Sequence, residues 1–244
     1  MFNARRTIAV ALAALPSAQS ADTLDVSAQR VAAPVLVCQV DLGVLQGELA
    51  RLSWAPNSLS MHLQTKDSRN NLYDYIVDLG NREISRAFGE PAWAAEYWMQ
   101  KSSLIAPGVP SLRLDVIENN RRTRPAPFTG GFANGGAQTV DLKNPVDAYE
   151  HELTLQFLGE PIGNWINGAP MAGETFGWGP PGTGALVYAD SSGRLTFIDR
   201  AKHKLAVAGV KEAILPAWSN DGRRLAFLQK TARRKFRLMI AVIE

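Results

Sequence analysis

The chain has 244 residues, of which 46% are hydrophobic and 20% are charged, and its formal net charge is +3. That length and composition allow one sizeable core and exclude a disordered or low-complexity chain. The single cysteine, Cys38, excludes an intrachain disulfide, and we expect it to be a buried thiol in a strand.

The first twenty residues have the layout of a signal peptide. Two arginines precede an apolar run over 7–16, and small residues lie just before Ala21. A membrane anchor is the alternative, but about ten apolar residues are half of what a crossing needs. We predict a signal peptide over 1–20, a periplasmic or secreted location, and no membrane segment after cleavage. Cleavage removes two positive charges and leaves +1, so a nucleic-acid partner is not expected.

Four tryptophans indicate a repeat in the rest of the chain. Each follows an extended approach, and their spacings are 39, 85 and 40 residues. The four are Trp54, Trp93, Trp178 and Trp218. Since the middle spacing is about twice the others, a degenerate copy is expected near residue 135, within GGFANGG (130–136). A period near 40 residues with several short strands is typical of propeller blades.

An alternating strand is expected about twenty residues after each repeat position. The candidates are LYDYIVDL (72–79), SLRLDVI (111–117), HELTLQF (151–157), RLTFID (194–199) and KFRLMIAVI (235–243). Their alternation of apolar and polar residues is typical of strands with one exposed face. The residues 94–101 have a helix-favouring composition, but the repeat predicts a strand there.

These strands predict an all-β fold, a single β-propeller domain over 21–244 with five blades, or six as the fallback. The last unit ends at Glu244 after three strands, so its fourth strand is expected from 35–45, paired with 235–243. This pairing of the two termini would close the ring and protect an exposed edge. A β-sandwich also contains many short strands, but the regular period argues against it.

The repeat resembles a known family. PAWSNDGRRLAFLQK (216–230), SWAPNSLSMHL (53–63) and FGWGPPGTGALVYA (176–189) are similar to the TolB-type, WD-like propeller repeat. Blades of that family carry a Trp-Ser-Pro-Asp-Gly turn before a strand; here Asn220 replaces the proline. The resemblance covers the repeats only, without the N-terminal α/β domain of TolB. It implies a propeller fold, an envelope setting and frequent use as a protein-binding platform.

The sequence lacks the common motifs of catalysis and cofactor binding. It has no G-x-S-x-G nucleophile elbow, and GGFANGG lacks the Lys-Ser/Thr of a phosphate loop. His62, His151 and His203 lie on separate repeats, and we expect them on strand surfaces rather than around a metal. We predict no catalytic residue, no metal and no cofactor.

The predicted partner is a protein or peptide in the cell envelope, bound on one face of a non-catalytic scaffold. Trp98 and Trp165 fall outside the repeat position and are candidates for stacking contacts. Arg233 and Arg234 lie in a basic turn before the last strand and are candidates for docking an anionic partner. The repeat tryptophans are expected in the core.

A glycan-active enzyme, a lyase or hydrolase, is the alternative function, because propeller scaffolds also host enzymes. It requires acidic or histidine side chains gathered at the funnel. The candidates are Asp74, Asp115, His151, Glu152 and Asp199. Two carboxylates roughly 5 to 10 Å apart in a pocket would favour this function, and scattered carboxylates would exclude it.

Overall fold

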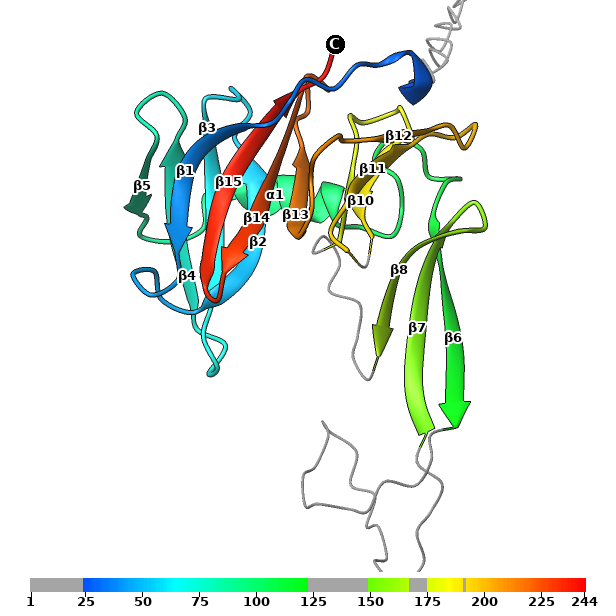
Figure 1. The fold of residues 1–244 in the computed structure, drawn as a ribbon, viewed down its shortest axis with the longest axis horizontal. Coiled ribbons are helices and arrows are strands. Elements are labelled where there is room, and N and C mark those ends of the chain that lie inside the picture. The colour runs from blue at the N-terminus through cyan, green and yellow to red at the C-terminus, as the bar shows by residue number, and fades with distance from the viewer. Residues whose placement is uncertain (1–23, 123–148, 167–174, 191) are drawn as a thin grey trace, which may run out of the picture.

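The computed structural model describes residues 24–122, 149–166, 175–190 and 192–244, and these form antiparallel sheets with one α-helix (Figure 1). The first sheet is β2 (Glu48–Trp54), β3 (Ser60–Lys66), β4 (Leu72–Asp78) and β5 (Glu83–Arg86); the second is β6 (Leu114–Arg122), β7 (Tyr149–Phe157) and β8 (Glu160–Ile166). The third is β9 (Phe176–Trp178), β10 (Leu186–Ala189), β11 (Leu195–Ile198) and β12 (Lys204–Ala206); the fourth is β13 (Ala213–Trp218), β14 (Arg224–Ala232), β15 (Lys235–Val242) and β1 (Val35–Asp41). The helices are α1 (Ala92–Lys101) and the 3-10 turn η1 (Val26–Ala28). The described residues form four sheets, whereas a β-sandwich has two.

Three of the four repeat tryptophans occupy one structural position. Trp54, Trp178 and Trp218 are the last residues of β2, β9 and β13, the first strands of the three four-stranded sheets. None of the three is more than 1% exposed. After Trp218 the chain turns through Gly222, whose φ of 77° suits glycine and whose carbonyl accepts the indole N–H at 2.9 Å. The repeat is confirmed at these positions.

The indoles fill the seams between neighbouring sheets. Trp54 belongs to the first sheet and donates its indole N–H to Ala217 C=O of the fourth, at 2.8 Å. The ring of Trp218 lies 4.7 Å from that of Phe197 in the third sheet. The ring of Trp178, in turn, lies 5.9 Å from Phe157 in the second. Trp178 and Trp218 therefore pack edge-on against a phenylalanine of the next sheet, an arrangement that aromatic pairs favour, and Trp54 joins its two sheets by a hydrogen bond.

The fourth tryptophan was assigned wrongly to the repeat. Trp93 is the second residue of α1 and is partly exposed, so the strand expected around 94–101 is a helix. Alanine, glutamate, methionine and glutamine in this stretch all favour a helix, and here that local preference decides the structure. The buried residues Ala94, Tyr97 and Lys101 follow helical spacing, and α1 lies against β2 and β9. The Tyr97 hydroxyl also donates to Trp218 C=O of the fourth sheet, at 2.8 Å.

The second sheet also differs from the expectation. SLRLDVI and HELTLQF were predicted in different blades, but β6 and β7 pair directly, from Leu114↔Phe157 to Arg122↔Tyr149. The degenerate copy expected near residue 135 lies outside the described residues, as does the signal peptide over 1–20. A count of five or six blades and a closed ring therefore stay predictions.

The predicted pairing of the two ends of the chain is confirmed. β1 pairs antiparallel with β15, from Val35↔Ile240 to Asp41↔Lys235, and Figure 1 shows the two strands side by side. Before β1 begins, the backbone of Arg30 exchanges two hydrogen bonds with the backbone of Glu244, at 2.7 and 2.8 Å. The N-terminal strand thus covers the edge that β15 would otherwise expose. No helix in the described part of the chain has the length and hydropathy needed to span a bilayer.

We predict that the Cys38 thiol is unreactive in the folded protein. Cys38 lies on β1, is 9% exposed, and its burial raises the pKa of the thiol to about 11. Because the thiolate is the reacting form, very little of it exists at pH 8. Ellman's reagent at pH 8 should therefore label the native chain only slowly and label it fully in guanidinium chloride. Rapid labelling of the native chain would show that β1 leaves β15.

Candidate functional site

The first sheet buries both of its faces. Trp54 and Leu63 lie on the face that forms a core with the fourth sheet. Because side chains alternate along a strand, the residues between them point to the other face. Four side chains there are polar and buried, and we call them the polar cluster: Ser53, His62, Gln64 and Asp74. The expectation that His62 lies on the strand surface is wrong, since it is 0% exposed.

Asp74 is the centre of the polar cluster. Its Oδ1 accepts hydrogen bonds from His62 Nε2 at 2.9 Å and from Gln64 Nε2 at 3.0 Å. Burial lowers the pKa of His62 below its ordinary value of 6.5, so the imidazole is neutral at neutral pH. A neutral ring that donates from Nε2 leaves Nδ1 as an acceptor. The arrangement therefore fixes both the histidine tautomer and the position of the carboxylate.

Three buried atoms of the polar cluster have no hydrogen-bond partner in the described part of the chain. They are Ser53 Oγ, His62 Nδ1 and Gln64 Oε1. Such groups are rare in folded proteins, and each costs about 1–3 kcal/mol when left unpaired. Where several such atoms lie together, ordered water or a polar ligand supplies the missing hydrogen bonds.

The polar cluster has the residue types of a serine hydrolase without its arrangement. In that site the serine hydroxyl bonds to the histidine and reaches the substrate. Here Ser53 Oγ makes no bond to His62, and Ser53 is 0% exposed. The polar cluster therefore does not have the arrangement of a serine-hydrolase site.

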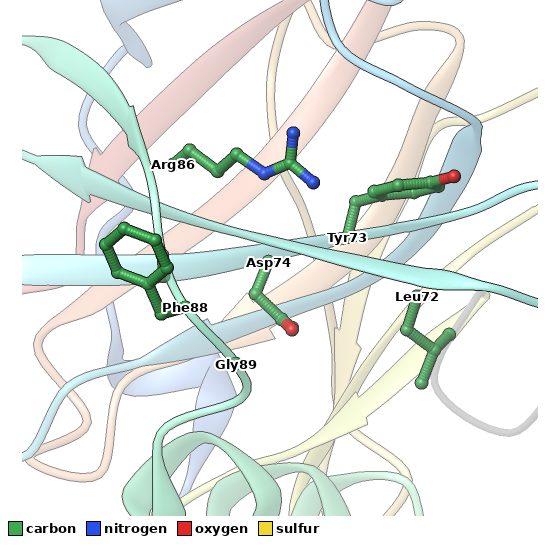
Figure 2. Close-up of a pocket in the computed structure, with 7 residues that line it drawn as sticks. Leu72, Tyr73, Asp74, Arg86, Phe88 and Gly89 are labelled. Carbon is green, nitrogen blue, oxygen red and sulfur yellow. The ribbon is translucent and has the colours of Figure 1, made fainter.

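A hollow of about 450 Å³ lies beside the polar cluster, and we call it the β4 hollow (Figure 2). It is lined by Leu72, Tyr73, Asp74, Arg86, Ala87, Phe88 and Gly89. Figure 2 shows the Asp74 side chain on one side of β4 and the side chains of Tyr73 and Arg86 on the other. The guanidinium carbon of Arg86 lies 5.5 Å from the Tyr73 ring centroid. Asp74 thus belongs to both the polar cluster and the hollow.

The β4 hollow opens where β5 diverges from β4. β5 pairs with β4 only as far as Tyr75, opposite Arg86, and a last bond runs from Ala87 N–H to Asp74 C=O at 2.8 Å. Backbone groups of alternate residues point to the same edge, so those of Leu72 face it too. No strand in the described ranges pairs with Leu72 on that side. A short stretch of free sheet edge therefore faces the hollow.

The segment that leaves β4 carries an exposed aromatic ring. Phe88 is fully exposed, and Leu72 across the hollow is 49% exposed. Gly89 follows with a φ of 131°, a conformation that residues with a Cβ rarely adopt, and nothing lies within 4 Å of where its Cβ would be. The glycine therefore allows the chain to turn away from the sheet and present Phe88 to solvent.

The start of α1 covers the polar face beside the hollow. Arg51 Nη1 lies 3.0 Å from Glu90 Oε1, and the Arg51 guanidinium carbon lies 5.2 Å from the Trp98 ring centroid. The Trp93 ring meets the His62 ring edge-on, with centroids 6.2 Å apart. Trp98, a predicted contact residue, is therefore a neighbour of this site and packs on a cation of the chain itself.

The structure does not bring the other predicted contact residues to this place. Trp165 lies on β8, opposite Leu153 in the second sheet. Arg233 and Arg234 lie in the turn between β14 and β15. Arg234 binds Glu48 Oε1 at 2.6 Å and a nearby backbone carbonyl at 2.7 Å, so it ties this turn to the connection between β1 and β2. A binding role for these residues stays a prediction.

The candidate carboxylates of the alternative enzyme lie on different sheets. Asp74 is on β4, Asp115 is on β6, and Asp199 follows β11. Asp115 is exposed and lies 3.8 Å from Arg113, whereas Asp74 and Asp199 are buried among other partners. His151 and Glu152 are on β7, and their side chains lie outside the described part of the structure. These three carboxylates have separate surroundings.

Asp199 belongs to a small cluster that fastens the N-terminal segment. His203 Nδ1 lies 3.1 Å from both Asp25 Oδ1 and Asp199 Oδ2, and Val26 N–H donates to Asp199 Oδ2 at 3.0 Å. Hydrogen bonds from Ser27 lower the pKa of Asp25. These contacts join η1 to the third sheet. The ligand atoms of Asp25, Asp199 and His203 lie within 4.8 Å of one another, so the absence of a metal stays a prediction.

No family model and no curated protein matches the chain. Among solved structures, a Dos1 propeller covers 78% of this chain at 9% identity and a TM-score of 0.24. TolB from Acinetobacter baumannii covers 82% at 11% identity and a TM-score of 0.22. This chain spans 41% and 44% of the length of those two proteins. At such TM-scores the likeness carries no argument, so the fold described here depends on strand pairing alone.

Proposed function

We propose that the protein is a non-catalytic scaffold that binds an extended peptide segment of a partner protein in the β4 hollow. The observation that carries the proposal is the free edge of β4 at Leu72 beside the fully exposed Phe88. An extended peptide can add backbone hydrogen bonds to such an edge while its side chains enter adjoining pockets. An exposed aromatic ring at the rim supplies the apolar contact that such interfaces concentrate.

The frame around the hollow supports binding without large rearrangement. The first sheet is held to the fourth by Trp54 and to the segment just before α1 by the pair of Arg51 and Glu90. A site on a packed sheet loses little conformational freedom when the ligand arrives, so more of the contact energy appears as affinity. We extend the proposal to a TolB-type propeller that is exported by residues 1–20 and acts in the cell envelope.

The proposal is tested with random dodecapeptides displayed on phage and selected on the folded full-length chain. We expect selected peptides to bind, and Phe88→Ser to weaken their binding at least tenfold, since burying an aromatic side chain contributes roughly 1.5–3 kcal/mol. Fluorescence polarisation with a labelled selected peptide measures the change. The matched control is Leu59→Ser, at an apolar residue in the turn between β2 and β3 that is 65% exposed.

Leu59→Ser should leave the affinity unchanged. If selected peptides bind both variants as tightly as the wild-type chain, the ligand site is elsewhere. If no peptide is selected at all, peptide binding itself is refuted. Circular dichroism shows whether each variant is folded before the affinities are compared.

A further inference from the structure

We propose that the β4 hollow selects a peptide that carries a lysine or arginine, whose cationic group binds Oδ2 of Asp74. The inference rests on the proposed function and adds the chemistry of the ligand. It depends on four features of Asp74. Its Oδ1 accepts two hydrogen bonds, its Oδ2 has no partner among the described residues, its hydrogen-bond donors are neutral, and it lines the β4 hollow.

The two oxygens of Asp74 have different roles. Oδ1 accepts both hydrogen bonds of the polar cluster, from His62 and Gln64. Oδ2 has no partner among the described residues, although the Asp74 side chain is only 10% exposed. A carboxylate held by one oxygen with the other free is oriented for a ligand before the ligand arrives.

No cation of the described chain neutralises Asp74. Its two hydrogen-bond donors are neutral: Gln64 always, and His62 because burial lowers its pKa. Arg51 is occupied by Glu90, and Arg86 lies over the Tyr73 ring on the other side of β4. A buried carboxylate without a counter-charge is costly, and a cation brought by a ligand offsets that cost.

The location of Asp74 connects this charge to the peptide site. Asp74 lines the hollow, and its carbonyl accepts the last hydrogen bond of the β4 edge, from Ala87. The next residue that faces this edge, Leu72, has no strand paired with it on that side in the described ranges, so an added strand would lie beside Leu72, whose side chain is on the same side of β4 as that of Asp74 (Figure 2). A long basic side chain would extend along Leu72 and place its charge at the carboxylate, a pairing that charged hydrogen bonds strengthen.

The test compares selections from the random dodecapeptide library on wild-type protein and on Asp74→Asn. We expect peptides from the wild type to share a lysine or arginine at one position, and peptides from Asp74→Asn to lack it. Asparagine keeps an oxygen for His62 and Gln64 and removes the charge, so the variant should fold. Asp78→Asn is the matched control, because Asp78 is an exposed carboxylate on the same strand; it should keep the preference.

A second measurement combines a change in the peptide with the Asp74→Asn variant of the protein. A selected peptide with its basic residue replaced by norleucine should bind the wild-type chain at least tenfold more weakly. The same replacement should change binding to Asp74→Asn less than twofold, as a double-mutant cycle requires for a direct pair. Peptides that bind through Phe88 with no basic preference would overturn this inference and leave the proposed function standing. Failure to select any peptide would overturn both.

Discussion

Replacing Trp54 by alanine should lower the free energy of unfolding by about 4 kcal/mol, a typical cost for removing a buried aromatic side chain. Trp54 is 1% exposed and closes the seam between the first and fourth sheets. The change leaves a cavity there and removes the hydrogen bond from the indole N–H to Ala217 C=O. Guanidinium denaturation followed by circular dichroism measures the loss.

Trp93→Ala is the matched control for that prediction. Both variants lose the same side chain, but Trp93 lies at the start of α1 and is partly exposed. We expect a loss below about 2 kcal/mol there, because substitutions away from packed cores have small effects. Equal losses in the two variants would contradict the assignment of Trp54, and not Trp93, to the seams between sheets.

The free energy of unfolding should rise by about 2 kcal/mol between pH 7 and pH 9, and Lys101→Met should abolish the rise. Lys101 is 3% exposed, and its burial lowers the pKa to about 7 from 10.5. Its ammonium donates to Gly179 C=O and lies 5.7 Å from the Tyr97 ring centroid. Between these two pKa values the unfolded chain holds a proton that the folded chain does not, so raising the pH favours folding.

Other buried titratable groups limit the pH range over which the free energy of unfolding rises. Burial raises the pKa of Cys38 to about 11 and that of Tyr97 well above 10, and both would oppose the rise at higher pH. Below pH 7 the lowered pKa of His62 makes stability fall as the pH drops through its unfolded value of 6.5. Denaturation midpoints at pH 7, 8 and 9 isolate Lys101. Lys230→Met, at an exposed lysine, should keep the rise; a rise that persists in Lys101→Met would refute this account.

The sequence predicts the parts of the fold that local chemistry decides. Trp54, Trp178 and Trp218 recur because each four-stranded sheet needs one large ring at the same place in its seam. The pairing of β1 with β15 follows from counting strands in the last unit, because an unpaired edge is unfavourable. Trp93 shows the limit of this reasoning: a tryptophan at the right spacing carries no repeat when its neighbours favour a helix.

Asp74 and Trp98 are candidates from the sequence, but their common site is not predicted, because it depends on tertiary packing. The alternation of His62 and Gln64 with apolar residues predicts a solvent-facing surface, and only the segment from Ala87 to Trp98 turns that surface into a second interior. One local feature of the sequence, Gly89 after Phe88, indicates that the chain diverges from β4 after β5. Nothing in the sequence indicates that Asp74 accepts hydrogen bonds from two neutral donors and pairs with no cation of the described chain. Arg86 lies only twelve residues away along the chain, so the sequence alone would suggest an ion pair between the two.

The central claim, that a peptide binds in the β4 hollow, is tested most directly by titrating the ¹⁵N-labelled protein with a display-selected peptide and recording amide chemical shifts. The account predicts that the largest shifts occur at Leu72, Asp74 and Phe88. Largest shifts at Trp165 or Arg233, with the amides around the β4 hollow unmoved, would contradict it.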